Sequence, residues 1–412
     1  MTIVAAPAAE PAPGPGTAAG AGARRGHVHQ VDVVRLLTFA AVIGVHAIAF
    51  TEPPSSRAWA GVLMLLQFGR EVFFALTGFV LVYSARGRPL VARAFWRKRF
   101  PVIVAPYLAW SAIYTAFHVW GGPAHARLSW PTVLWDFASG NAEYHLYFLL
   151  VSMQLYLVFP LLLRFVRRTE ARAWPVLGVV GALNVAWLAW LQYGHGPAGW
   201  AGHLWPRAYE LLPTYSVYVL SGAYAALHVD RIEQLVAEHR RRLLAVAAGA
   251  AVVAEVAFWA QVGGRDPRLA AAVLQPAMVL TSIAALIGLY LAGTAWVDRG
   301  RPGAGLVARA SDLSFAVYLA HPLVLEVLLR LGLGNDGQRL PAPFATALAV
   351  LGTAAGAAAI AVVARRSRWS LPLTGRPRPR PRPRPAPHQS SADESVRAVT
   401  ESSQVGSGPW VS

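Results

Sequence analysis

The sequence predicts an all-α, polytopic integral membrane protein with about ten transmembrane helices, and three observations lead to that fold class. Hydrophobic residues make up 55% of the chain and charged residues only 14%, whereas soluble domains carry about 25% charged residues. Long apolar runs alternate with short loops, and most charges lie in the loops. Each run has about 20 residues or more, enough to cross a hydrocarbon core of ~30 Å.

The apolar runs give an ordered set of predicted spans. The sixth is the weakest because it contains Glu210 and Pro213, and we expect the ninth to kink at Pro322. The first follows Arg24 and Arg25 and is interpreted as an uncleaved anchor. In chain order the spans are 31–50, 60–84, 101–120, 144–163, 174–193, 209–228, 243–262, 270–293, 306–329 and 342–364.

Composition divides the chain into three parts. Residues 1–27 are rich in Ala, Pro and Gly and are predicted to be disordered. Residues 28–365 form the membrane domain. Residues 366–412 are predicted to be a disordered cytoplasmic tail, in which 376–385 alternate Arg and Pro and favour an extended polyproline II conformation. This tail is either a solvated spacer or a segment attracted to anionic lipid headgroups.

The distribution of basic residues predicts the orientation. With the tail left aside, Arg and Lys are roughly three times as frequent in the loops on the N-terminal side of the membrane as in those on the other side. Basic residues accumulate on the cytoplasmic side of membrane proteins. Both termini are therefore predicted to be cytoplasmic, and we expect a multi-pass protein of the plasma membrane whose surroundings are the lipid bilayer.

Several function classes are disfavoured. The net charge of +17 is almost entirely arginine beside apolar runs, as in topology signals, so nucleic acid is not expected as a partner. The chain has no cysteine, which excludes thiolate catalysis and cysteine metal sites. It also lacks a Walker loop, a Gly-x-Ser-x-Gly elbow and a His-x-x-x-His motif, and we expect no metal.

Polar residues inside the membrane are costly and are usually functional. In the first span, Arg35 and His46 are separated by a spacing that brings them within about 20° of each other on an ideal helix, roughly 16 Å apart along its axis. Asp32 lies close to the same stripe. This face is therefore expected to run from an acid and a base at the cytoplasmic end to a histidine in the outer half, where a structural hydrogen bond is the competing explanation for His46.

The second span contains adjacent charges, Arg70 and Glu71, that point about 100° apart on a helix. They are predicted not to pair side by side, so each is expected to need a partner on another helix. After this span, Arg97, Lys98 and Arg99 form a basic cluster at the cytoplasmic mouth. Topology alone explains that cluster, but it also suits phosphate groups.

Further polar groups occur in two later spans. Glu143 and His145 open the fourth span, and Tyr318 and His321 lie in the ninth, followed by Glu326 and Arg330 at a spacing that favours a structural ion pair.

At these positions the sequence resembles the membrane acyltransferase-3 family. The resemblance covers about residues 28–365 and combines four motifs in the right order. They are Arg-x10-His (Arg35 and His46), a Gly-x-x-x-Phe-Phe-x-Leu-Ser-Gly-like stretch (Gly69 to Gly78, with Thr77 in place of serine), a basic cluster before Pro-Tyr (Arg97 to Arg99, Pro106 and Tyr107), and Tyr-x-x-His (Tyr318 and His321).

The resemblance implies an enzyme that uses cytoplasmic acyl-CoA, often acetyl-CoA, as donor substrate and acylates a hydroxyl of a carbohydrate, a lipid-linked glycan or a small molecule. His46 is then the candidate base or transient acyl carrier. Arg70 is the candidate oxyanion group, and Glu71 or Glu143 would orient the imidazole.

The same resemblance implies two binding regions. Donor phosphates would be held by Arg35, Arg97, Lys98 and Arg99. The acceptor would be held by Glu143, His145, Tyr318 and His321. Two other functions stay open: a transporter or exporter of a glycan or lipid intermediate, whose polar stripe would line a path, and a non-catalytic scaffold whose tail recruits partners.

Overall fold

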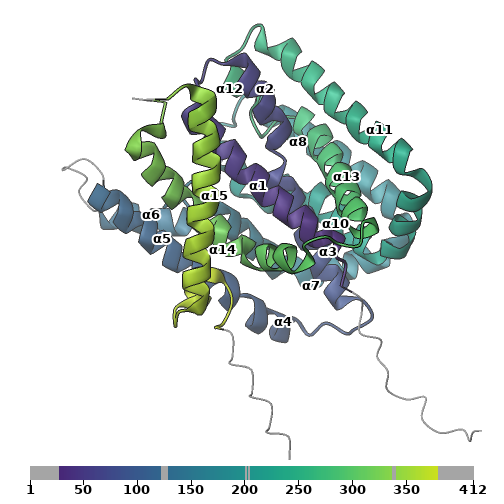
Figure 1. The fold of residues 1–412 in the computed structure, drawn as a ribbon. Coiled ribbons are helices and arrows are strands. Elements are labelled where there is room, and N and C mark those ends of the chain that lie inside the picture. The colour runs from purple at the N-terminus through teal and green to yellow at the C-terminus, as the bar shows by residue number, and fades with distance from the viewer. Residues whose placement is uncertain (1–26, 122–128, 200–201, 203–204, 336–339, 379–412) are drawn as a thin grey trace, which may run out of the picture.

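The computed structural model describes residues 27–121, 129–199, 202, 205–335 and 340–378. Over this part of the chain the protein is a helical bundle, with α1 passing through the middle and α11 forming an outer edge (Figure 1). Nine helical segments among the described residues are long and apolar enough to cross a membrane. The predicted class, a polytopic all-α membrane protein, is therefore confirmed.

The helices follow the predicted spans, with shorter elements between them. In chain order they are α1 (Gln30–Thr51), α2 (Arg57–Leu66), α3 (Gly69–Ala85), α4 (Ala92–Arg99), α5 (Pro101–Gly121), α6 (Trp130–Ser139), α7 (Tyr147–Arg168), η1 (Glu170–Arg172), α8 (Ala173–Tyr193), η2 (Trp205–Glu210), η3 (Leu212–Tyr215), α10 (Ser216–Leu227), α11 (Val229–Val262), α12 (Pro267–Ala270), α13 (Ala277–Asp298), α14 (Ala304–Leu328), the π-helical turn η4 (Leu329–Leu333), α15 (Ala342–Arg366) and α16 (Ser370–Thr374).

Two predicted spans differ from the structure. The sixth contains only a 12-residue α-helix, α10, preceded by the 3-10 turns η2 and η3. Pro206 and Pro213 lie in those turns, where each removes a backbone donor from a regular helix. The second span is divided at Gln67 and Phe68 into α2 and α3. This break matters because Gln67 and Gly69 line a cavity described below.

Helix α3 is held in the bundle centre by an unusually close contact with α10. A Cβ added to Gly222 would lie 1.8 Å from the carbonyl oxygen of Ala75, and one added to Gly78 would lie 2.3 Å from that of Val219. Small residues at such positions let helix backbones approach in a membrane, where packing rather than the hydrophobic effect drives association. Gly78 therefore has a structural explanation.

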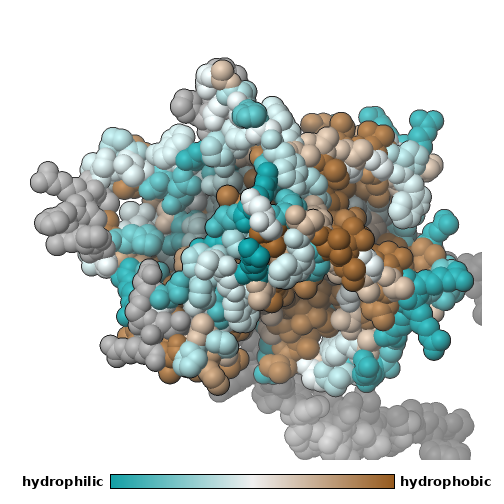
Figure 2. Space-filling view, turned by 90° about the horizontal axis from the view of Figure 1, so that it is seen from above, coloured by the Kyte–Doolittle hydropathy of each residue, from teal (hydrophilic) through white to brown (hydrophobic). Residues whose placement is uncertain are grey.

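The outer faces of the bundle are apolar. Leu161 on α7, Leu183 on α8, Val256 on α11 and Leu351 on α15 are each more than 60% exposed. Seen from the end that holds α2 and α12, hydrophobic residues extend along one flank while hydrophilic residues gather nearer the centre of that end (Figure 2). This is the pattern expected of a bundle whose flanks contact lipid.

The first and last described segments meet at one end of the bundle. Ser311 on α14 donates a hydrogen bond of 2.9 Å to Asp32 on α1, and the neighbouring Asp312 forms an ion pair with Arg376. The start of the first helix and the chain after α15 therefore lie at the same end of the bundle, as the topology prediction requires.

The tail prediction needs a correction. The sequence predicts disorder throughout residues 366–412, but Ser370 to Thr374 form α16, in which both of those side chains are buried. Helix α16 packs against α5, α14 and α15. Local composition misses it because tertiary packing, rather than helix propensity, stabilises so short a helix. Residues 1–26 and 379–412, to which the other disorder predictions refer, lie outside the described residues.

Candidate active site

One face of α1 lines two cavities that lie end to end. Arg35 lines a cavity of about 210 Å³, His46 lines another of about 390 Å³, and Phe39 lines both. Arg35, Phe39, Val42 and His46 follow the i, i+4, i+7, i+11 pattern of a single helix face. The structure therefore places Arg35 and His46 on one stripe, as their spacing predicts.

The cavity at His46 is formed by α1, the α2–α3 break, the start of α7 and α14. Its lining combines aromatic rings with a few polar groups, which is typical of a site that binds a small molecule. The polar and titratable members are Thr38, His46, Gln67, Arg70, Tyr144, His145, Tyr147 and Tyr318.

Three imidazoles lie close together beside this cavity. The ring centroids of His46 and His321 are 5.3 Å apart, and those of His321 and His145 are 5.4 Å apart. The His46 ring also lies 4.6 Å from that of Tyr144. Within the described part of the chain, the ring contacts of His46 are with these two aromatic side chains, His321 and Tyr144.

A proline fixes the position of His321. Pro322 has no N–H, so the carbonyl of Tyr318, one turn earlier, is not bonded by the helix backbone. The Nδ1 atom of His321 lies 2.6 Å from this carbonyl oxygen and must donate to it. In the neutral ring, Nε2 is then the unprotonated nitrogen. Helix α14 continues through Pro322 as one α-helix.

Arg70 is partly buried, lines the cavity and is held by three groups. Its Nη1 donates to the hydroxyl of Tyr147 at 3.0 Å and to that of Tyr215 at 3.5 Å, while Nη2 donates to Glu71 at 3.1 Å. The prediction that Arg70 and Glu71 do not pair is therefore wrong. Both residues lie in the first turn of α3, and the long arginine side chain spans the angle between them to reach the neighbouring carboxylate.

The two carboxylates proposed to orient His46 are placed elsewhere. Glu71 contacts Arg70, and its Oε2 is buried without a partner. Glu143 Oε2 lies 2.9 Å from Nε2 of His118, and its Oε1 accepts from the backbone of Tyr144. Burial raises the pKa of the Glu143 carboxyl above its usual value, and the hydrogen bond from His118 offsets only part of this rise. The structure does not bring either carboxylate to the His46 ring.

The residues predicted to hold the acceptor substrate include two of the three histidines described above. Tyr318 donates a hydrogen bond of 2.8 Å to the carbonyl of His145, and both residues line the cavity. Both ring nitrogens of His145 and the Nε2 of His321 are buried without a partner. Buried polar atoms of this kind need an explanation, and a ligand or ordered water would supply the missing hydrogen bonds.

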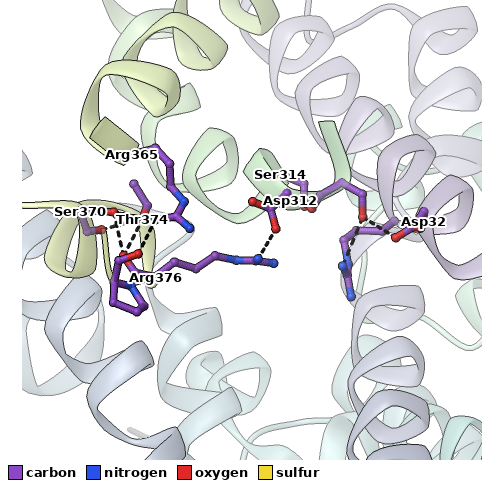
Figure 3. Close-up of polar contacts among 10 residues, drawn as sticks. Asp32, Asp312, Ser314, Arg365, Ser370, Thr374 and Arg376 are labelled. Atoms are coloured by element: carbon purple, nitrogen blue, oxygen red, sulfur yellow. Dashed lines mark hydrogen bonds and ion pairs between the residues drawn. The ribbon is translucent and has the colours of Figure 1, made fainter. Parts of the chain in front are cut away.

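The second cavity is cationic. Arg35, Arg99 and Arg376 line it, together with Asp312. Arg35 donates a hydrogen bond of 3.3 Å to Ser311, which in turn donates to Asp32. Figure 3 shows Arg376 reaching from the segment after α16 toward Asp312, with Asp32 farther along the same end of the bundle.

The predicted basic cluster contributes only in part. Arg99, the last residue of α4, lines the cationic cavity, whereas Arg97 and Lys98 are exposed and are not part of its lining. Successive helical residues point about 100° apart, so only one of three in a row faces a given site. The local sequence could not show which one.

Three phenylalanines separate the cavities. Phe39, Phe73 and Phe148 line both of them. The centroid of Phe73 lies 5.7 Å from that of Phe39 and 4.6 Å from that of Phe148. They form an aromatic partition between the Arg35 end and the His46 end of the site.

Two kinds of residue at the candidate site are not predicted from the sequence. The first kind is the pair of tyrosines, Tyr147 and Tyr215, that accept hydrogen bonds from Arg70. A guanidinium inside the membrane requires partners, but this rule does not identify them. Arg376 lines the cationic cavity from the tail. Its membership in an Arg-Pro run instead predicts either a solvated spacer or attraction to anionic lipid headgroups.

One group of side chains with metal-ligand atoms lies outside these cavities. His27, His29 and Asp32 bring one ligand atom each to within 4.8 Å of one another. His27 Nε2 lies 2.5 Å from Asp32, and Arg301 donates to His29 at 2.6 Å. These hydrogen bonds already satisfy the cluster, and the guanidinium disfavours a further cation.

The chain was compared with family models, curated proteins and solved structures. Residues 28–363 match the family model of an acyltransferase domain. No curated protein matches the chain, and no solved structure does.

Proposed function

We propose that this chain, which belongs to the acyltransferase-3 family of membrane acyltransferases, transfers an acyl group from cytoplasmic acyl-CoA to a hydroxyl. The acyl group is acetyl, and the acceptor is a carbohydrate, a lipid-linked glycan or a small molecule. The observation that carries this proposal is the pair of cavities along α1, one lined by guanidinium groups and the other by imidazoles, separated by three shared phenylalanines.

The cationic cavity supports an acyl-CoA donor. The predicted topology places the Arg35 end of α1 on the cytoplasmic side of the plasma membrane, where acyl-CoA is found. Acyl-CoA carries several phosphate charges, and guanidinium groups bind phosphate with two parallel hydrogen bonds. Arg35 and Arg99 are the donor-binding residues that the sequence analysis and the cavity have in common.

The imidazole cavity supports the acceptor and the chemistry. His46 takes the proton of the acceptor hydroxyl while its oxygen attacks the thioester carbonyl. The tetrahedral intermediate then collapses, the C–S bond breaks, and the CoA sulfur leaves with the proton from His46. Arg70 stabilises the oxyanion. In a second version, His46 itself carries the acyl group between donor and acceptor.

The residues around His46 change which side chains we propose to orient its imidazole. Tyr144 and His321 flank the ring, while Glu71 and Glu143 have other partners. We therefore assign the orientation of His46 to Tyr144 and His321. His145, Tyr318 and Glu143 remain the proposed acceptor contacts.

The test uses membranes that contain the protein, radiolabelled acetyl-CoA and a panel of hydroxylated acceptors. We expect His46→Ala to lower transfer by about 10²-fold or more, because it removes the general base. Arg35→Ala is expected to raise the KM for acetyl-CoA, because it removes a phosphate contact. Parental rates for both variants would overturn the mechanism.

A matched control uses a histidine outside the cavities. His228→Ala alters the residue between α10 and α11 and should leave transfer unchanged. If substrate moves across the membrane with no dependence on acyl-CoA, the transporter alternative is the correct one instead.

A further inference from the structure

The segment that follows the matched family region returns to the site. The family match ends at residue 363, whereas Arg376 lines the cationic cavity together with Arg35 and Arg99. Helix α16 makes this return possible, because it turns the chain back beneath α5 and α14 after α15 has ended. The tail therefore contributes a charged group that the family match does not include.

Hydrogen bonds from side chains to the backbone of this segment hold it in place. The indole of Trp110 donates a hydrogen bond of 3.1 Å to the carbonyl of Leu373, and Ser370 donates one of 2.8 Å to the carbonyl of Arg376. Arg365 donates to Ser370 at 3.1 Å. Gly375 has a φ of +68°, and a Cβ there would come within 3 Å of Phe315. These contacts fix the backbone from which the Arg376 side chain extends.

The charges of the cavity are unbalanced in favour of an anion. Three guanidinium groups and one carboxylate, that of Asp312, line it. Asp312 pairs with Arg376 (Figure 3). Both side chains are a little less than half exposed. An ion pair with this degree of exposure is weak and exchangeable, so an incoming phosphate can replace the carboxylate as the partner of Arg376.

We propose that Arg376 binds a phosphate group of the acyl-CoA donor and that Asp312 is the internal counter-ion which this phosphate displaces. The inference rests on the proposed function, because it names a further residue of the same donor cavity. It assigns a binding role to the first arginine of the Arg-Pro run and leaves the rest of the tail out of the site.

The first experiment compares Arg376→Ala with a matched control, Arg368→Ala. Arg368 belongs to the same segment but lies over the ring of Trp369 and does not line the cavity. With acetyl-CoA, we expect Arg376→Ala to raise KM about tenfold with little change in kcat, and Arg368→Ala to match the wild type. S-acetylpantetheine has no phosphate, so its KM should be the same for all three proteins.

The second experiment reverses the sign. Asp312→Asn removes the competing carboxylate and should lower the KM for acetyl-CoA, an outcome that a merely misfolded variant cannot give. An unchanged KM for Arg376→Ala, or an equal rise with S-acetylpantetheine, would overturn the inference. So would a higher KM for Asp312→Asn.

Two further arms separate the possible explanations. The assay is repeated in vesicles of phosphatidylcholine alone; a KM effect that requires anionic phosphatidylglycerol would assign Arg376 to lipid headgroups and overturn the inference. Equilibrium binding of CoA is measured without turnover. Binding that depends on Arg376 in a protein that transfers no acetyl group would reject the proposed function but keep this site, whereas normal transfer by Arg376→Ala with an unchanged KM would reject only this inference.

Discussion

A guanidinium inside the membrane needs partners for its N–H groups, and Arg70 finds them on α3, α7 and η3. The same network leaves Glu71 almost wholly buried, with Arg70 as the cation that compensates its charge. At this scale a single side chain is both a structural partner and a candidate catalytic group. The two roles can be separated because only the structural one depends on Glu71.

We expect Arg70→Ala to lower stability by about 3–5 kcal/mol, because it leaves a buried carboxylate without its cation. The double variant Arg70→Ala/Glu71→Gln should recover much of this loss, since the uncompensated charge is gone. Thermal unfolding in detergent measures both variants. Equal destabilisation of the single and double variants would show that the pair is not the cause.

The catalytic role of Arg70 gives the complementary result. If it stabilises the oxyanion, transfer stays about 10²- to 10³-fold below the wild type even in the more stable double variant. Recovery of activity together with stability would limit Arg70 to a structural role.

At the scale of elements, the position of α3 decides the geometry of the site. This helix supplies Arg70 and Phe73 to the His46 cavity and Thr77 to the cationic cavity. Its depth depends on the close contact with α10, where Gly222 and Gly78 meet backbone atoms of the facing helix. The position of α3 is therefore set by its packing against the short helix α10.

We expect Gly222→Ala to lower stability by about 3 kcal/mol and to reduce transfer, because the new methyl group would overlap the Ala75 carbonyl unless the helices separate. Gly178→Ala on α8 is the control, since no atom lies within 4 Å of the added Cβ there. Unfolding midpoints of the purified variants measure the difference. Equal midpoints for the two substitutions would contradict the close contact.

At the scale of the whole molecule, the main feature is the partition between two cavities. In the proposed reaction the thioester must reach His46, while water must be kept from hydrolysing it. Phe39, Phe73 and Phe148 lie where the two cavities meet and come from α1, α3 and α7. Three separate helices thus form one barrier.

We expect Phe73→Ala to raise the release of CoA from acetyl-CoA several-fold when no acceptor is present, because it joins the two cavities and admits water to the thioester. Phe79→Ala is the control, since Phe79 is also on α3 but stacks on Tyr83 and lines neither cavity. Free thiol is measured with time. Equal rates for both variants would show that Phe73 is not part of a barrier.

Periodicity along α1 was enough to place Arg35 and His46 on one face, because a single helix has a fixed angle per residue. Apolar length was enough to predict the membrane class, because the bilayer sets the length of a span. Both properties are local, and the sequence by itself determined them. The order of the four motifs likewise led to the family that the later match supports.

Contacts between helices could not be read in this way. Nothing local shows that Tyr147 and Tyr215 hold Arg70, that Arg99 rather than Arg97 faces the cavity, or that Arg376 returns from the tail. Each depends on the rotation and depth of separate helices, which packing sets and sequence spacing does not. The membrane class, most of the spans and the face of α1 that carries Arg35 and His46 were therefore determined by the sequence, whereas the partners of the charged side chains and the residues that line the cavities were decided by the tertiary structure.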